Sequence, residues 1–328
     1  MRSQKRTGGG TAAAAAAVAA AEGADVERSL SMDADEDDDK SKKKSNAARH
    51  HEFYYVDARR VIILDEDAIQ HGTVCWDVSR TKLVDIYLEA LNEVHPQSMV
   101  HIVMTGYVAS NTHGVATTLQ RDGSDYSAAI LGKLLSSTQI NIWTDVDGCL
   151  SADPRRVPGA YVIPDVSYNE AMELSYFGAK VIHPKTMQPA ISANPQIPIY
   201  IRNTFNPSFR GTRIFVTSTT QSSDSEKCVC GFSSIEDMAL INVEGTGMMG
   251  VPGVCNRLFG SLEKAGVNVV LISQASSEHT ITFATRQEKA MVAKQVLHEE
   301  FHREIAANHI SDIYVKQPCS IIAAVGDG

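Results

Sequence analysis

Short apolar runs alternate with amphipathic segments through most of this sequence, and this alternation limits the folds that the chain can adopt. Residues 60–65, 100–104 and 139–143 have the length and composition of buried strands. Between them, residues 81–91 and 125–136 place apolar side chains on one face at helical spacing. Strands that alternate with helices are typical of a parallel-rich sheet with helices on both faces, so we predict an α/β fold.

The N-terminal segment has a different composition. It contains an alanine tract at 12–21, an acidic run at 33–39 and a lysine cluster at 40–44. Such a segment has too few large apolar side chains to build a core, so we predict a disordered low-complexity tail over residues 1–52. A basic start before an alanine tract is weakly similar to a targeting peptide, but the acidic run argues against a transit peptide. We expect a cytoplasmic or plastid protein that is not secreted.

Net charge and cysteine usage exclude several classes of function. The formal net charge of -9 provides no overall basic field, so we predict neither nucleic acid nor a membrane as a partner. No apolar run is long enough to span a bilayer. The 6 cysteines lack the paired spacing of a zinc site, so we predict reduced thiols and no metal site built from protein side chains.

A polar stretch at 217–227 indicates a boundary between two domains. Beyond it, the apolar pattern predicts a compact βαββα unit. Its elements are a strand at 239–243, a helix at 252–265, strands at 268–273 and 280–284, and a helix at 288–300. Residues 321–326 then repeat the pattern of residues 240–245, as if a second copy of the unit began there.

The residues around Gly123 predict a helix start that binds an anion. A glycine turn directly precedes an amphipathic helix that begins with Ser124 and Asp125, so unpaired backbone N–H groups and the positive end of the helix dipole face a ligand. Arg121 adds a guanidinium suited to a carboxylate, and Ser124 can donate a hydrogen bond. An ordinary helix after a turn explains the same residues, so both interpretations stay open at this point.

A second polar group follows the strand at 139–143. Thr144 and Asp145 lie at the end of this strand, and Gly148 turns the chain shortly afterwards. The carboxyl edge of a parallel sheet is where α/β proteins bind ligands, so these residues are candidates for a binding site.

Two basic residues lie further along. Arg155 is on the following loop, and Lys180 comes after a helix that Ser167 and Glu170 begin with a capping box. A lysine there could neutralise a phosphate. Taken singly, each of these residues is as compatible with a structural role as with a functional one.

Taken in order, these motifs resemble those of aspartate kinase. The resemblance covers residues 54–328 and depends on five motifs, which are residues 117–125, 143–148, 153–155, 177–184 and 206–212. The form of the first motif, together with residues 175–177 and 274–279, is most similar to the plant-type bifunctional aspartate kinase-homoserine dehydrogenases. We therefore use the aspartate kinase pattern to state the following expectations.

The resemblance implies a partial amino-acid-kinase fold followed by ACT regulatory units. Residues 53–216 would form the C-terminal part of the kinase domain, and 217–230 a linker. Residues 231–308 would form a ferredoxin-like βαββα ACT domain, and 309–328 the start of a truncated second one.

The resemblance also implies phosphoryl transfer from MgATP to the side-chain carboxylate of L-aspartate, giving 4-phospho-L-aspartate. This reaction is the first step of lysine, threonine and methionine biosynthesis. The implied substrate-binding residues are Thr118, Arg121, Gly123 and Ser124, with Ser124 and Asp125 as the catalytic pair at the reacting end. The implied ATP-binding residues are Thr144, Asp145, Gly148, Arg155 and Lys180. A carboxylate nucleophile is already ionised at neutral pH, so the site has to align reactants and neutralise charge.

This sequence departs from the family pattern in two places. The family opens with a strand and glycine turn that contain a phosphate-binding lysine, and it has a glutamate for the substrate amino group; the low-complexity segment stands in their place. Leu150 stands where the family usually has a tyrosine beside the nucleotide. We therefore expect the isolated chain to have little or no kinase activity.

Residues 245–250 match the pattern G-x-G-x-x-G, which suggests a dinucleotide site. Pro252 would interrupt the helix of that motif, and the next strand ends in Ser273 and Gln274 without the required acidic residue. Similarity to an ACT domain accounts for these residues better. It implies an effector site for threonine or lysine at Met249, Gly250, Val251, Gly253 and Gln274, and a homo-oligomer formed through the ACT units.

Two further hypotheses stay open. The chain could be a non-catalytic regulatory protein that binds an amino acid through its ACT unit, since that unit is more nearly whole than the kinase part. It could also be an incomplete gene product.

Overall fold

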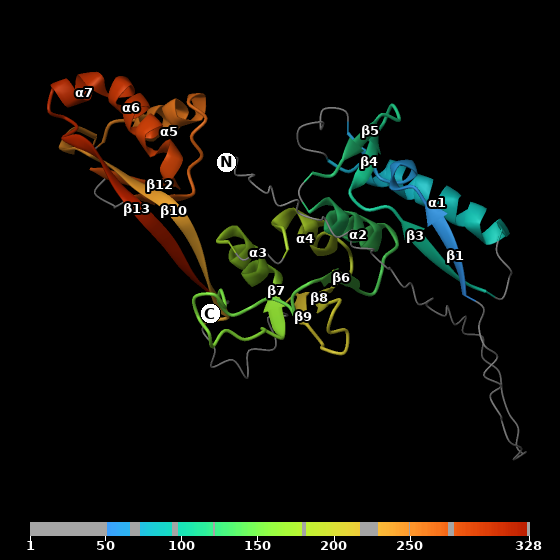
Figure 1. Cartoon of the computed structure of the whole chain (residues 1–328). Coiled ribbons are helices and arrows are strands. Elements are labelled where there is room, and N and C mark those ends of the chain that lie inside the picture. Colours follow the sequence, from blue (N-terminus) through green and yellow to red (C-terminus); the bar gives the residue numbers. More distant parts are fainter. Residues whose placement is uncertain are drawn as a thin grey trace, which may run out of the picture. The chain divides into compact units, whose positions relative to one another are not determined.

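The computed structural model describes residues 51–65, 73–93, 98–120, 122–178, 182–216, 229–248, 250–274 and 279–326. These residues divide into two compact units (Figure 1). Unit 1 contains the described residues up to Gly231 together with Gly326, and unit 2 is Phe232–Val325. Nearly all of the predicted tail and most of the predicted linker lie outside the described residues. The predicted tail boundary is two residues too late, because His51 and Glu52 already belong to the first strand.

Unit 1 contains short strands in three sheets, with helices between them. In chain order its elements are β1 (His51–Val56), η1 (Ala58–Arg60), β2 (Ile63–Leu64), α1 (Trp76–Glu93), β3 (Met99–Met104), β4 (Val108–Asn111), β5 (Ala116–Thr118), α2 (Gly123–Leu134), β6 (Ile140–Thr144), β7 (Asp165–Ser167), α3 (Tyr168–Tyr176), α4 (Pro184–Ile191), β8 (Ile199–Asn203) and β9 (Thr212–Phe215). The alternation of strands and helices predicted from the sequence is confirmed.

The strands pair mostly in parallel. β1 pairs with β3, β2 with β4, β6 with β8 and β7 with β9, each in parallel. The antiparallel pairs are β4 with β5 and β8 with β9. The parallel-rich sheet expected from the sequence is therefore present, divided into orders β1-β3, β2-β4-β5 and β6-β8-β9-β7.

The predicted strand at 60–65 is wrong in its first half. Asp57 caps a 3-10 turn at Ala58–Arg60, its side chain accepting a hydrogen bond from the Arg59 amide. Only Ile63–Leu64 of the run pairs as a strand. Apolar side chains in a short run can be buried from either conformation, and the polar cap selected the turn here. By contrast, the capping box at Ser167 and Glu170 forms as predicted and starts α3.

Helix α2 lies at the centre of unit 1. It packs beside α4 and against β6, and most of its side chains are buried (Figure 1). The hydrophobic core of the β1–α2 part joins residues of this helix, such as Ile130, to Ile62, Leu83 and Leu119, which precede it in sequence. The start of α2 is therefore held in place by a continuous core.

Unit 2 is an antiparallel sheet of order β11-β12-β10-β13 with helices against one face (Figure 1). Its elements are β10 (Gly231–Glu244), η3 (Thr246–Met248), α5 (Val254–Lys264), β11 (Leu271–Gln274), β12 (Thr280–Arg286), η4 (Gln287–Lys289), α6 (Ala290–Glu300), α7 (His302–Ala306) and β13 (Asp312–Val325). Leu258, Phe283, Leu297 and Phe301 are at the centre of its core. The predicted βαββα order is confirmed.

Residues 321–325, whose pattern repeats that of residues 240–245, lie within β13, next to β10 in the sheet of unit 2. A strand with apolar residues can pair with any open edge, and the edge of β10 is in the same unit. The assignment of 309–328 to a second ACT domain stays a prediction.

Two findings concern membrane-spanning helices and the state of the cysteines. Within the described ranges, no helix combines the length and apolarity that a bilayer crossing requires. The five described cysteines, Cys75, Cys149, Cys230, Cys255 and Cys319, are free thiols, as predicted.

Phe283 tests the packing of unit 2. Its side chain is fully buried in the core, so Phe283→Ala is expected to lower the free energy of unfolding of this unit by about 3–5 kcal/mol. Phe232 is the matched control, since it lies in the same sheet with 53% of its surface exposed, and Phe232→Ala is expected to change stability little. Denaturant titration followed by circular dichroism measures both. Equal losses would contradict the packing.

Candidate functional site

The start of α2 is an open helix end. Gln120 and Asp122 both have positive φ, at 64° and 52°, so the chain turns sharply before the helix. Asp122 occupies the N-cap position but its side chain makes no capping hydrogen bond. The first backbone N–H groups of the helix are thus free of a side-chain cap, which suits an anionic ligand.

Two glycines permit this arrangement. A Cβ on Gly106 would come within 2.8 Å of the Ser124 hydroxyl oxygen, and one on Gly123 within 2.7 Å of the Tyr107 ring. The Tyr107 amide donates to the Ser127 hydroxyl at 3.0 Å, and this hydroxyl donates to the Gly123 carbonyl. The loop after β3 and the start of α2 are therefore in close contact, and a larger residue at either glycine would separate them.

Asp125 is the electrostatically unusual group of this region. Burial, and then the nearby Asp122 carboxylate, raises the pKa of Asp125 to about 6. At neutral pH the group is mostly ionised, in a position that solvates the charge poorly. A cation beside Asp125 would stabilise the site, and the open end of α2 would favour an anion next to it.

The other predicted group lies at the carboxyl end of β6. Thr144 ends the strand, and its carbonyl accepts from the Thr204 amide after β8 at 2.9 Å. Asp147 accepts from the side-chain amides of Asn203 at 2.9 Å and Asn206 at 3.2 Å. The loop after β6 is thus tied to the loop after the neighbouring parallel strand, and Thr144 and Asp145 are held at the sheet edge.

Gly148 and Thr212 complete this loop. Gly148 has φ 144°, and a Cβ there would lie 2.4 Å from the Thr212 hydroxyl oxygen. That hydroxyl is fully buried, accepts from the Cys149 amide and donates to the Ile163 carbonyl. The role of Gly148 in this structure is steric: it lets β9 approach the loop.

An exposed aromatic residue lies on the same loop network. Phe205 follows Thr204, and its amide donates to the Asn203 side-chain oxygen at 2.9 Å. Its side chain is 83% exposed, whereas large apolar side chains are usually buried. A firmly held backbone therefore presents an aromatic ring to solvent one residue from the contact with Thr144.

The remaining predicted residues fall in three places. Arg155 forms an ion pair with Asp153 at 2.7 Å and is 88% exposed, so it lies on the surface of its loop. This pairing lowers the pKa of Asp153 to about 2. Thr118 ends β5 in register with Val108. Arg121 and Lys180 lie outside the described residues.

Sequence reasoning assigned no role to Asp147, Asn203, Phe205 or Thr212. Their local signals were the second aspartate of the turn at 145–148 and the polar residues after β8. These signals identify a loop, but Asp147 and Asn203 are 56 residues apart in sequence, and Thr212 and Cys149 are 63 residues apart.

In unit 2, the loop before α5 meets the end of β11. The Cys255 sulfur lies 3.8 Å from the side-chain oxygen of Gln274. Gly250 and Gly253 have positive φ, at 66° and 87°, and Val251 between them is 51% exposed. Met249 lies outside the described residues. The predicted effector residues that are described therefore border one region of the unit.

The G-x-G-x-x-G pattern has a structural explanation. A Cβ on Gly245 would lie 2.2 Å from the His309 carbonyl oxygen, and one on Gly247 would lie 2.3 Å from the His309 Cβ. The chain continues as a 3-10 turn at Thr246–Met248 rather than as a long helix. Close packing against His309 thus accounts for both glycines.

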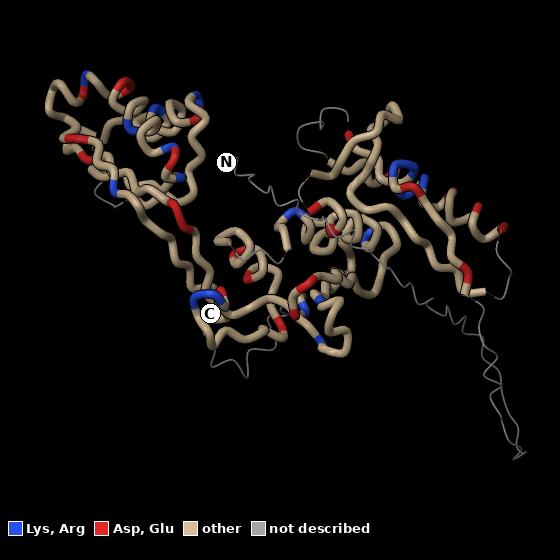
Figure 2. The backbone as a smooth tube through the Cα atoms, in the orientation of Figure 1, with Lys and Arg blue, Asp and Glu red and all other residues tan. Residues whose placement is uncertain are grey.

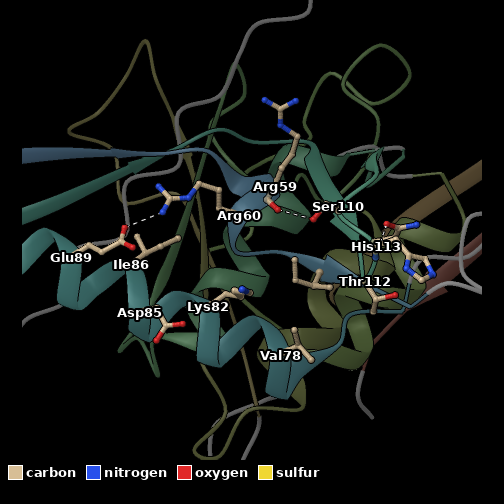
Figure 3. A pocket seen from close by; sticks show the side chains of 13 residues that line it. Arg59, Arg60, Val78, Lys82, Asp85, Ile86, Glu89, Ser110, Thr112 and His113 are labelled. Carbon is tan, nitrogen blue, oxygen red and sulfur yellow. Dashed lines mark hydrogen bonds and ion pairs between the residues drawn. The ribbon is translucent and has the colours of Figure 1, made fainter.

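Unit 1 also has a hollow of about 710 Å³ between η1, α1 and the turn after β4 (Figure 3). Arg60 and Glu89 form an ion pair at 2.9 Å on one side, and the Ser110 hydroxyl donates to the Arg59 carbonyl on the other. None of the predicted site residues lines it. Among the described residues, no three histidine, cysteine, aspartate or glutamate side chains gather as a metal-ion cluster.

Two ranges of the chain match known protein families. Residues 7–203 match the model of the amino acid kinase family, and residues 241–301 match an ACT domain model. A bifunctional aspartokinase/homoserine dehydrogenase 1, chloroplastic, from Zea mays is 49% identical over 225 residues, which are 69% of this chain and 24% of the maize protein. This chain thus spans about a quarter of that relative.

Solved structures show the same likeness. Clostridium acetobutylicum aspartate kinase superposes with a TM-score of 0.67 at 25% identity, over 83% of this chain and 57% of that one. Escherichia coli aspartokinase III in complex with aspartate and ADP gives a TM-score of 0.60 at 25% identity, over 84% and 58%.

Asp125 makes stability depend on pH. Its folded-state pKa of about 6 lies above its ordinary value of 3.8, so the folded state binds this proton more tightly, and stability falls as pH rises from about 4 to 6. Asp125→Asn removes this loss. The variant is expected to be more stable than the wild type by about 1–3 kcal/mol at pH 8, after allowance for partial exposure, with the gain vanishing near pH 4.

Denaturant unfolding at pH 4, 6 and 8 measures this effect. Asp145→Asn is the control, because Asp145 is an exposed carboxylate in the loop after β6. A pH-independent difference between Asp125→Asn and wild type would contradict the raised pKa.

Proposed function

The chain belongs to the amino acid kinase family, and on that premise we propose that it acts in phosphoryl transfer from ATP to the side-chain carboxylate of L-aspartate. The product is 4-phospho-L-aspartate. The proposal is supported by the maize relative, which is an aspartokinase/homoserine dehydrogenase, and by the likeness to an aspartokinase structure with aspartate and ADP.

The observation on which this function depends is the open start of α2 with the desolvated Asp125 beside it. Ser124 and the free N–H groups of the first turn suit an anionic substrate, and Arg121 would bind its α-carboxylate. A nearby cation would stabilise the poorly solvated Asp125 carboxylate, and Mg²⁺ held by the nucleotide phosphates would be that cation. Because the substrate carboxylate is already ionised, these groups position it and balance charge, and no general base is required.

The edge at the end of β6 would bind the nucleotide. Thr144, Asp145 and Gly148 lie in a loop that Asp147 and Thr212 hold in place. Arg155 and Lys180 would neutralise the phosphates, with Mg²⁺ reducing the repulsion between them and the incoming carboxylate. The local rigidity of this edge favours transfer, since misplacement of the reacting atoms by about 1 Å is costly.

Unit 2 would regulate the reaction. Gly250, Val251, Gly253 and Gln274, with Met249, would bind an amino-acid effector, threonine or lysine, and ACT units would join copies of the chain into an oligomer. The plant relatives are chloroplastic proteins, so we propose a plastid as the site of action.

A second candidate function is supported by the contact between Cys255 and Gln274, which brings the start of α5 next to the end of β11 within unit 2. In that case the chain binds an amino acid and has a regulatory role without catalysis.

The sequence contains no lysine-phenylalanine-glycine-glycine strand, so we propose weak kinase activity for this chain by itself.

Titration calorimetry and an ADP-release assay separate the two functions. We expect MgATP to bind with an affinity that aspartate increases, and slow aspartate-dependent ADP release. Asp125→Ala is expected to abolish the effect of aspartate on ADP release while leaving threonine or lysine binding unchanged. Effector binding without any MgATP binding would favour the regulatory function instead.

Phe205 provides a test of the nucleotide edge. A ring so exposed beside Thr144 suits stacking against adenine, which contributes about 1–3 kcal/mol per base. Phe205→Ala is expected to weaken MgATP binding about tenfold and to leave binding of inorganic tripolyphosphate unchanged.

Phe209→Ala is the matched control, because Phe209 lies in the same loop and is 41% exposed. Quenching of Trp143 fluorescence in a Trp76→Phe background reports binding, since Trp143 precedes Thr144. Equal weakening of both ligands would show a general loss of the loop rather than lost stacking.

A further inference from the structure

Two histidine side chains meet across the β1-β3 sheet. The Nδ1 atom of His51 lies 2.7 Å from the Nε2 atom of His101, and the ring centroids are 4.9 Å apart with 22° between the ring planes. The centroid separation exceeds the nitrogen separation by close to the radii of the two rings, so the two nitrogens point at each other. One ring therefore donates its proton to the lone pair of the other.

A thioether belongs to the same face of the sheet. The parallel register places Met99 opposite His51, and His101 follows Met99 by two residues along β3. Side chains two residues apart on a strand share a face, and neighbouring strands lie only about 4.8 Å apart. Met99 is 38% exposed, so the core does not enclose its side chain. These three residues, His51, Met99 and His101, are here called the β1-β3 cluster.

The backbone beneath the β1-β3 cluster is well held. Strands β1 and β3 pair in parallel over their whole lengths of 6 residues each. The Ser98 hydroxyl donates to the Glu52 carboxylate at 2.6 Å and joins the starts of the two strands. The Phe53 ring lies against the His101 ring, with 4.9 Å between centroids and 23° between planes. The His101 ring is thus positioned by two neighbouring rings.

No fixed positive charge on these two strands opposes a cation. Figure 2 shows β1 and β3 without Lys or Arg. Their acidic residue, Glu52, belongs to the opposite face because side chains alternate along a strand. The cluster therefore offers neutral nitrogen and sulfur donors. Hard cations such as Mg²⁺ and Ca²⁺ take oxygen ligands, so this donor set favours a transition metal.

Among transition metals, the donor set favours copper. Imidazole nitrogen suits zinc, nickel and copper ions, whereas thioether sulfur selects Cu(I). Two nitrogens that each bind one ion at about 2.0–2.1 Å lie about 3–3.5 Å apart at the angles of three- and four-coordinate ions. The His51 and His101 nitrogens, now 2.7 Å apart, have to separate by less than about 1 Å, and the exposed His51 ring is free to rotate by that much.

We propose that His51, His101 and Met99 bind one Cu(I) ion at the β1-β3 sheet. The ion takes the place of the proton that the two imidazoles share, and Met99 supplies the third ligand. The site revises the expectation from sequence that no metal site is built from side chains. The two histidines are 50 residues apart, and only the pairing of β1 with β3 brings them together.

The proposal is independent of phosphoryl transfer. None of the three residues belongs to the predicted substrate, nucleotide or effector sets. Loss of copper binding and loss of kinase activity are therefore separate results.

Competition for Cu(I) tests this site. The full chain, with its accessible thiols blocked by N-ethylmaleimide so that they do not bind copper, is titrated anaerobically with Cu(I) against the coloured chelator bicinchoninate. We expect one ion per chain. His51→Ala and His101→Ala are each expected to weaken binding by about 100-fold or more, because the loss of even an outer partner at a metal site costs about 10–100-fold.

Met99→Leu separates the thioether from the shape of the side chain. Leucine keeps an apolar side chain of similar size but has no sulfur. We expect this change to weaken Cu(I) binding about tenfold and to leave the weaker Zn²⁺ binding of the two imidazoles unchanged. X-ray absorption of the Cu(I)-loaded chain is expected to show two nitrogen ligands and a sulfur ligand that Met99→Leu removes.

A matched variant controls for nonspecific binding by imidazole. His113 is an exposed histidine of the same unit, in the turn between β4 and β5, and His113→Ala should keep the wild-type affinity. Circular dichroism checks that each variant folds. Because His51 is exposed, His51→Ala leaves the core intact, and it decides the question even where His101→Ala lowers stability.

Two results would overturn the proposal. The first is an affinity for Cu(I) that His51→Ala leaves unchanged, or no bound Cu(I) at all, which would leave the histidine pair as a hydrogen bond of the sheet alone. The second is Zn²⁺ bound as tightly as Cu(I), with no effect of Met99→Leu on either ion, which would remove the thioether and the preference for copper.

Discussion

The buried hydroxyl of Thr212 connects the parts of unit 1 that the candidate nucleotide edge requires. It accepts from the Cys149 amide and donates to the Ile163 carbonyl, so one fully buried side chain joins β9, the loop after β6 and the approach to β7. A buried hydroxyl without partners would be costly, and both of its partners come from distant segments. Gly148 is required for the same approach.

Charge is distributed unevenly around the two halves of the site. The start of α2 combines an open helix end with the poorly solvated Asp125, while the β6 edge keeps Asp147 paired with two amides. At the start of α2, an anionic ligand and a cation would stabilise the uncapped N–H groups and the Asp125 carboxylate. At the β6 edge, the two amides already stabilise the Asp147 carboxylate. Binding and positioning are thus divided between the start of α2 and the end of β6 in unit 1.

Much of the fold could be predicted from local patterns. The alternation of apolar runs and helical segments correctly indicated a parallel-rich α/β unit, and the later pattern indicated the βαββα order. The Ser167 and Glu170 capping box was readable because all of its contacts lie within one helical turn. The run at 60–65 was misread, since periodicity over a few residues does not separate a buried turn from a buried strand. The position of residues 321–325 in β13, beside β10, is a long-range pairing that a local pattern does not specify.

The candidate site shows where local information ends. Residue types and spacing were enough to select Ser124, Asp125, Thr144 and Asp145, because an open helix start and a strand end are local features. The raised pKa of Asp125, the amides around Asp147 and the exposure of Phe53 and Tyr55 on β1 were decided by tertiary structure. Each depends on which segments far apart in sequence come together and on how much water they exclude, and neither quantity is present in a local pattern.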